Sequence, residues 1–238
     1  MSIIDRIITI GIPHKCYLCG NPIVDFYYID WYGHKICKKH KHPLPHCVSC
    51  FQYCNQSAVD IGTGALLCSY CQKHVVTKAD CAHIIEFIRK IFNKCPIGSI
   101  TNWHLKVVDA PTLYSMTGDA NIRGLAQRFG NDYTIFVFRH LSKVQFANVI
   151  THEMLHIWQY NRDIHASPIY TEGFCNLGSY VVMKAINNVE SNSTIDRMIH
   201  SKDPVYGDGL RLMKSFFEQG QWESAIKELI NSHRTHNI

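Results

Sequence analysis

The spacing of cysteines in the first third of the chain constrains its fold more than any other feature. Two consecutive segments each contain a Cys-x2-Cys pair, an interval of 17 residues and a second ligand pair, and the second segment repeats the first after 31 positions. The potential ligands are Cys16, Cys19, Cys37 and His40 in the first segment and Cys47, Cys50, Cys68 and Cys71 in the second. Four sulfur or imidazole ligands in two such pairs are typical of a closed tetrahedral zinc site. We therefore expect two structural zinc ions, which supply much of the folding free energy of this small module.

His34 is an alternative ligand in the first segment, because His34-x2-Cys37 follows the ligand order of LIM domains. The 31-residue repeat favours His40 instead, since His40 corresponds to Cys71. The cysteines outside the pattern are expected to be free thiols; they are Cys54, Cys81, Cys95 and Cys175. The odd total of 11 cysteines and their spacing favour metal-bound thiolates over disulfides.

A His-Glu-x-x-His motif at residues 152–156 is the second strong feature. It lies in a run from Lys143 to Arg162 without proline or glycine, which predicts a helix. One helical turn separates His152 from His156, so both imidazoles can bind one zinc ion. Glu153 can then reach a water on that metal and act as its general base. The same helix face carries further polar side chains, which we expect to form the floor of a cleft; they are Gln145, Asn148 and Gln159.

A catalytic zinc ion needs a third protein ligand and an open position for water. Glu172 lies 16 residues after His156, on a second helix expected to begin near Tyr170. Glutamate-type zincins take their third ligand from such a helix, so Glu172 is the favoured candidate. His165 is the competing candidate, although it lies in the predicted turn. Asn176, one turn after Glu172, can accept a hydrogen bond from a ligand histidine. The cofactors expected are thus one catalytic and two structural zinc ions.

We expect an α+β chain of two domains, a tandem zinc-ribbon or LIM-like module at residues 1–78 and a mainly helical glutamate-zincin domain with a small sheet at 79–238. In the second domain, the pattern of apolar residues predicts a helix at 79–93 and strands at 103–108 and 133–138. The segment 110–132 is rich in turn-forming residues and predicts a long loop, with a hairpin as the alternative. The strand 133–138 is either a sheet edge that borders the cleft or a plain core strand.

The C-terminal part of the chain contains a further candidate for the active site. We predict a turn at 191–194, a loop at 203–209 that opens a helix ending at Phe217, and a last helix at 221–231. Tyr206, in that loop, could donate a hydrogen bond to the oxyanion of an acyl-transfer reaction. Its alternative role is a buried tyrosine in a capping turn. His200 is a weaker candidate for the same function.

Charge and hydropathy give weaker constraints. The net charge is +5, and residues 1–78 contain eight Lys and Arg against four Asp, which is too mild a surplus to indicate nucleic-acid binding. The sequence has no run of about 18 apolar residues, so we expect no membrane span. The N-terminus is too short and too charged for a signal peptide, and the expected location is the cytoplasm.

The ordered set of motifs resembles the plant organ-size-regulating, ubiquitin-activated LIM-domain zinc peptidases, over most of the chain. The resemblance is carried by Lys15-Cys16-Tyr17-Leu18-Cys19, Cys37-x2-His40, Pro45-His46-Cys47-Val48-Ser49-Cys50, Leu67-Cys68-x2-Cys71, His152-Glu153-Met154-Leu155-His156-Ile157-Trp158, Glu172-Gly173-Phe174-Cys175 and Pro204-Val205-Tyr206-Gly207-Asp208-Gly209. It implies a zinc endopeptidase of the glutamate-zincin type. It also favours His40 over His34, and it implies a catalytic role for Tyr206 and a supporting role for Asp208.

The resemblance adds ubiquitin or ubiquitinated proteins as candidate partners. The plant proteins carry ubiquitin-interacting motifs before their LIM domain, and the short segment before Cys16 leads us to expect a compact form without them. The primary hypothesis is a zinc endopeptidase that acts on a protein or peptide substrate with Glu153 as general base. The alternatives are a non-catalytic zinc-finger adaptor that binds a protein or nucleic acid, and a hydrolase of non-peptide amides.

Overall fold

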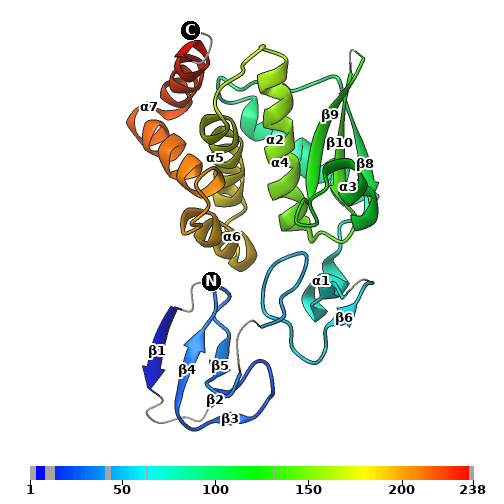
Figure 1. The fold of residues 1–238 in the computed structure, drawn as a ribbon, viewed down its shortest axis with the longest axis vertical. Coiled ribbons are helices and arrows are strands. Elements are labelled where there is room, and N and C mark those ends of the chain that lie inside the picture. Colours follow the sequence, from blue (N-terminus) through cyan, green and yellow to red (C-terminus); the bar gives the residue numbers. More distant parts are fainter. Residues whose placement is uncertain (1–3, 9–13, 41–43, 63, 131, 236–238) are drawn as a thin grey trace. The chain divides into compact units, whose positions relative to one another are not determined.

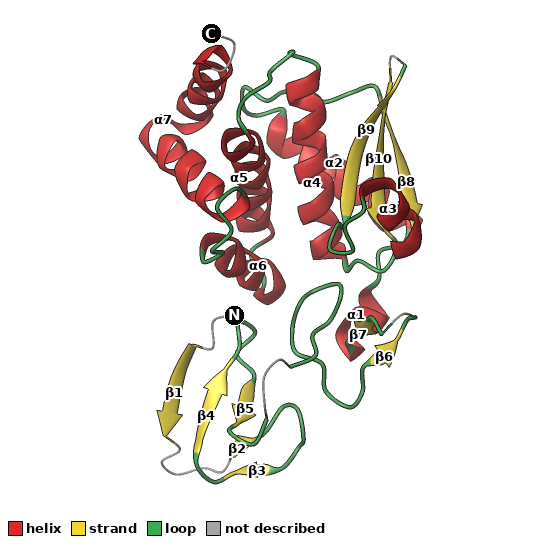
Figure 2. Cartoon of the chain, viewed as in Figure 1, coloured by secondary structure: helices red, strands yellow, loops and turns green. Residues whose placement is uncertain are grey.

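The computed structural model describes residues 4–8, 14–40, 44–62, 64–130 and 132–235. The chain divides into two compact units, residues 1–75 with 140–142 and residues 76–139 with 143–238. The principal boundary therefore lies three residues before the predicted one. The first unit contains mainly short strands and loops and the second mainly helices (Figure 2), so the α+β class is confirmed.

In its described residues, the first unit contains three small sheets and one short helix. Its three-stranded antiparallel sheet has the order β1-β4-β5, formed by β1 (Ile4–Ile8), β4 (Phe26–Ile29) and β5 (Lys35–Cys37). Two hairpins pair β2 (His14–Lys15) with β3 (Pro22–Ile23), and β6 (Val59–Asp60) with β7 (Leu66–Leu67). Helix α1 (Ser69–His74) follows β7. Strands this short bury little apolar surface, which agrees with a module stabilised by metal ions.

The repeat seen in the sequence is also present in the backbone hydrogen bonds. The N–H of Cys16 donates to the carbonyl of Asn21 at 2.8 Å, and the N–H of Cys47 donates to that of Gln52 at the same distance. Each loop also contains one residue in the left-handed backbone conformation. These are Gly20, with φ of 71°, and its counterpart Phe51, with φ of 67°. Since that conformation costs an L-residue about 1–2 kcal/mol, the second loop is under strain that the first avoids.

The second unit contains a three-stranded sheet and six helices (Figure 1). The sheet has the order β8-β10-β9, in which β10 (Asp132–Phe138) is parallel to β8 (Trp103–Val108) and antiparallel to β9 (Gly124–Phe129). The helices are α2 (Lys78–Phe92), α3 (Ala110–Thr117), α4 (Lys143–Tyr160), α5 (Pro168–Ile186), α6 (Val189–Ile199) and α7 (Tyr206–Thr235). Helix α4 packs between the sheet and α5, and α7 covers the other side of α5. None of the helices in the described ranges is long and apolar enough to cross a membrane.

The segment 110–132 is not the long loop that was predicted. Asp109 accepts a hydrogen bond from the N–H of Thr112 at 3.0 Å and starts α3, and the second half of the segment is strand β9. The alternative of a hairpin is correct, because β9 pairs with β10. As β10 is the central strand and its side chains from Tyr133 to Phe138 are all buried, the hypothesis that it forms the sheet edge is wrong. The edge strand beside α4 is β9.

The predicted turn at 191–194 is also wrong, because these residues lie within α6. Asn188 and Ser191 form a capping box, in which each side chain accepts the other residue's N–H at 2.8–2.9 Å. A cluster of small polar residues therefore begins a helix here instead of ending one. The two last predicted helices are both present; they are labelled together as α7 and are separated by a kink, where Gly220 and Gln221 have non-helical dihedral angles.

The beginnings of α5 and α7 meet backbone to backbone at two glycines. A Cβ atom placed on Gly173 would lie 2.4 Å from the carbonyl oxygen of Gly209, and one on Gly209 would lie 2.4 Å from that of Ile169. Any side chain at either position would push the helices apart. This contact places Tyr206, the first residue of α7, close to the N-terminal part of α5, where Glu172 is the fifth residue.

We predict that Gly173→Ala lowers the free energy of unfolding by about 1–3 kcal/mol, because the new methyl group overpacks a backbone contact that cannot yield. The matched control is Gly118→Ala, where φ is 73° and nothing lies within 4 Å of the added Cβ, so only the cost of about 1 kcal/mol for the backbone conformation applies. Urea unfolding, followed by tryptophan fluorescence, measures the loss of unfolding free energy in both variants. Equal losses in the two variants would contradict the steric argument.

Candidate metal centres

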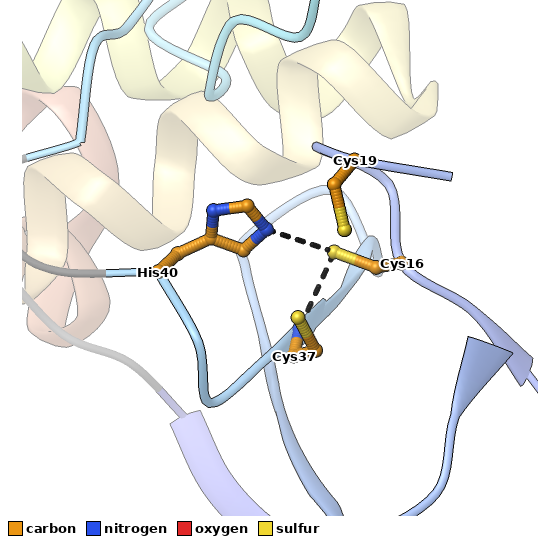
Figure 3. Close-up of side chains that lie close together, drawn as sticks. All are labelled: Cys16, Cys19, Cys37 and His40. Carbon is orange, nitrogen blue, oxygen red and sulfur yellow. Dashed lines mark hydrogen bonds between the residues drawn. The ribbon is translucent and has the colours of Figure 1, made fainter. Parts of the chain in front are cut away.

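The first group of potential metal ligands in the described residues is the predicted set Cys16, Cys19, Cys37 and His40, whose ligand atoms lie within 4.8 Å of one another. Figure 3 shows the His40 imidazole and the three thiols directed toward one point. The distance from Cys16 Sγ to His40 Nε2 is 3.3 Å, and the backbone N–H of Cys37 donates to Cys16 Sγ. Burial alone would raise the pKa of the Cys16 thiol, but backbone N–H donors from Cys37, Cys19 and Leu18 lower it to about 6. Such a thiolate suits a metal ligand.

His34 does not belong to this group. Its Nδ1 lies 2.9 Å from Asp30 Oδ2, and its ring stacks on Tyr17 with the centroids 3.7 Å apart. The side chain of Asp30 is almost fully buried and also accepts the backbone N–H groups of Tyr32 and His34. His34 therefore stabilises the turn between β4 and β5, whereas the imidazole near the three thiols is that of His40, as the repeat predicts.

The second group consists of the four buried thiols of Cys47, Cys50, Cys68 and Cys71. Hydrogen bonds with the other thiols hold the pKa of Cys68 well below its usual range. Its sulfur also accepts an N–H from the Gln52 side chain at 2.6 Å. Four buried sulfur atoms within 4.8 Å of one another are the donor set of a structural zinc site, so the residues present fit the metal.

The third group lies between α4 and α5, where the two histidines of the 152–156 motif face Glu172. The Nε2 atoms of His152 and His156 are 3.2 Å apart, and Glu172 Oε2 lies 3.0 Å from the first and 3.6 Å from the second. Zinc–ligand bonds of about 2.0–2.1 Å in a tetrahedral site place neighbouring ligand atoms about 3.3 Å apart. The three atoms are therefore spaced as ligands of one zinc ion would be.

The electrostatics of this group favour a cation. Burial disfavours the charged forms of Glu172 and His152. Hydrogen bonds from His152 and His156 nevertheless hold the pKa of Glu172 well below its usual range, and the hydrogen bond with Glu172 raises the pKa of His152. The side chains of His152, His156 and Glu172 keep exposures of 15, 12 and 19%, so solvent reaches one side of the group. A bound metal would thus keep a position open toward water.

The other ring nitrogens of both histidines face consecutive residues of α5. His152 Nδ1 lies 3.0 Å from Asn176 Oδ1, as predicted, and the Asn176 amide donates to the carbonyl of Tyr206 at 3.0 Å. His156 Nδ1 lies 3.5 Å from the sulfur of Cys175. The Cys175 thiol is also within metal-binding range of the histidines. Because its sulfur faces Nδ1 of His156 and not Nε2, Glu172 is the better third ligand for a metal bound by the two Nε2 atoms.

Glu153 lies beside the ligands with its carboxylate almost fully buried. Its Oε2 accepts the backbone N–H of Ala126, on edge strand β9, at 2.8 Å. A Cβ on Gly124 would lie 2.9 Å from Glu153 Oε1, so the strand approaches α4 as closely as a glycine permits. Gly124 and Ala126 were not predicted to lie at the site, because their segment was expected to be a loop.

Two tyrosines border the group. The ring of Tyr206 lies 6.3 Å from that of His152, and burial with the charges of Glu172 and Glu153 raises the pKa of Tyr206 to about 12. The phenol is therefore a neutral hydrogen-bond donor. Tyr160 stacks on His156 with the centroids 6.0 Å apart. It was not predicted, although its position four residues after His156 puts it on the same helix face.

Other candidates lie outside the group. His165 is exposed and pairs with Asp163 at 2.8 Å, His200 Nδ1 lies 2.8 Å from its own helix backbone, and Asp208 forms an ion pair with Arg211. The contacts of Asp208 thus do not indicate the supporting role that was expected. The polar face of α4 is not an open cleft floor either, because two of its side chains are buried in contacts with α5 and α6; they are Gln159 and Gln145.

No family model, curated protein or solved structure matches the chain. The class of the protein is therefore defined by its own geometry, which shows three groups of potential metal ligands in the described residues: one of three cysteines and a histidine, one of four cysteines, and one of His152, His156 and Cys175, beside which Glu172 lies. These groups support metal binding, and their nitrogen and sulfur donors suit zinc.

We predict that His40→Ala releases the metal of the first group, whereas His34→Ala retains it. The reason is that His40 directs a ring nitrogen at the three thiols and His34 pairs with Asp30. Native mass spectrometry of the purified variants counts the ions per chain. Loss of one zinc ion from His34→Ala together with its retention in His40→Ala would reverse the assignment.

Proposed function

We propose that this protein is a zinc-dependent endopeptidase. The observation that carries the proposal is the triangle of His152 Nε2, His156 Nε2 and Glu172 Oε2, with sides of 3.0–3.6 Å, next to the buried carboxylate of Glu153. Two imidazoles and one carboxylate with an open fourth position are the donor set of a hydrolytic zinc site. The two thiol-containing groups are closed sets of four ligands and are proposed to be structural.

Zinc bound to this triangle would polarise the scissile carbonyl and lower the pKa of a bound water. Glu153 accepts the proton of that water and delivers it to the leaving amine. The N–H of Ala126 fixes the orientation of this carboxylate, since it binds Oε2 and leaves Oε1 for the proton transfer. The phenol of Tyr206, which is neutral at pH 7, donates to the carbonyl oxygen as this gains negative charge, and its raised pKa keeps it protonated at alkaline pH as well.

A peptide substrate is favoured over a small amide by the position of β9. This strand has a neighbour on one side only among the described strands, and it contacts Glu153 through Ala126. An extended peptide that pairs with the free edge of β9 would run past the three ligand atoms. The order of motifs supports a relationship with the plant LIM-domain peptidases, and on that basis ubiquitin or ubiquitinated proteins are proposed as partners.

We predict that Glu153→Gln retains three zinc ions per chain but cleaves a protein substrate about 10²–10⁴ times more slowly, because the amide cannot accept the proton. Identification of new peptide termini in a lysate treated with wild-type or variant protein finds the substrates, and rates are then measured on one of them. Two zinc ions per chain and no cleavage that depends on Glu153 would instead favour a zinc-finger adaptor.

We predict that Tyr206→Phe lowers kcat about 10²–10³-fold with little change in metal content, since it removes only the hydrogen bond to the developing oxyanion. The matched control is Tyr114→Phe, an exposed tyrosine on α3. Steady-state kinetics on the same substrate measure the effect. An unchanged kcat would assign Tyr206 to a structural role.

A further inference from the structure

The two histidines of the third group differ in the atom that faces Nδ1, the ring nitrogen that does not point at the proposed metal. A metal-binding histidine usually donates its second ring N–H to an acceptor, which fixes the tautomer and the orientation of the ring. Asn176 provides that acceptor for His152. The atom facing Nδ1 of His156 is the sulfur of Cys175, at 3.5 Å. A thiol is a weak acceptor, so its presence at this position needs an explanation.

We propose that Cys175 is the positioning residue of His156, and this inference rests on the proposed zinc site. Its sulfur accepts the Nδ1–H of His156 and thereby leaves Nε2 unprotonated toward Glu172 and the metal. The thiol has no exposed surface, so it is not a surface nucleophile, and its sulfur faces Nδ1 of His156, whereas the proposed ligand atom of that ring is Nε2.

The sulfur is itself held in place from α4. The side-chain N–H of Gln159 donates to Cys175 Sγ at 3.1 Å and also lies 3.4 Å from the carbonyls of Leu155 and Thr171. Gln159 is only 1% exposed, so this network is shielded from water. Two N–H donors from α4 therefore converge on one sulfur of α5, and the sulfur links the two helices that carry the metal ligands.

Removal of the thiol should weaken metal binding and leave the fold intact. In Cys175→Ala the buried Nδ1–H of His156 has no acceptor, so we expect the affinity of the third site for zinc to fall about 10–100-fold, as for other partners of ligand histidines. In Cys175→Ser the hydroxyl oxygen replaces the acceptor, and the affinity should stay within about threefold of the wild type. The control is Cys81→Ala, which removes a buried thiol from α2.

Native mass spectrometry of the full chain at graded chelator concentrations measures the release of each zinc ion. The expected result is earlier release of one ion in Cys175→Ala alone, with Cys175→Ser and Cys81→Ala near wild type. If wild-type protein binds only two ions, the proposed function fails. If it binds three and Cys175→Ala releases the third like the wild type, only the role of Cys175 is refuted.

A second measurement does not depend on the alanine variant folding. Cobalt(II) in the third site lacks thiolate charge-transfer bands, so its visible spectrum is distinguishable from those of the sulfur sites. An oxygen acceptor should polarise the His156 imidazole differently from sulfur, so Cys175→Ser should shift the cobalt bands of this site. A cysteine that only fills space in the core predicts superimposable spectra, and that outcome would overturn the proposal.

Discussion

The packing of α4 against α5 is the interaction on which the third metal group depends. Helix α4 supplies two imidazoles one turn apart, and α5 supplies Glu172 within 3.6 Å of both. The same pair of helices supplies the outer partners, because Asn176 and Cys175 lie one turn beyond Glu172. Neither helix alone supplies all three atoms of the triangle. A shift of about 1 Å of one helix relative to the other would therefore break the contact between Glu172 and the two imidazoles.

A glycine contact extends this arrangement to a third helix. The approach of Gly209 to Gly173 seats the first turn of α7 on α5, and the Asn176 amide then binds the carbonyl of Tyr206. Asn176 therefore connects His152 to the segment that carries the candidate oxyanion donor. The tyrosine is fixed by backbone contacts and not by its own ring, which leaves its hydroxyl free for a substrate.

Site residues could be predicted from the sequence where ligand spacing or the helix period determines their position. The two thiol groups follow from a 31-residue repeat. His152 and His156 follow from helical spacing, as does Asn176 relative to Glu172, whereas Glu172 was expected from where glutamate-type zincins carry their third ligand. Prediction failed where contacts between segments distant in the sequence determine the structure. Strand β9 contains Gly124 and lies in a segment rich in turn-forming residues, so its pattern resembles a loop, and only its pairing with β10 and its contact with α4 make it a strand. Residue type alone could not reveal that Cys175 faces a ligand histidine.

The two units also differ in how they relate to metal. In the first unit, the four thiols of the second group lie in one buried cluster with Cys54 and Leu67, and a metal ion bound by them would have a closed set of four ligands. In the second unit the potential ligands of the third group also contact other protein groups. His152 and Glu172 pair with each other at 3.0 Å, and Ala126 orients Glu153. A zinc ion bound at the third group would replace the pairing of His152 with Glu172, and its three protein ligands would leave one position for water, unlike the closed sets of four in the first unit.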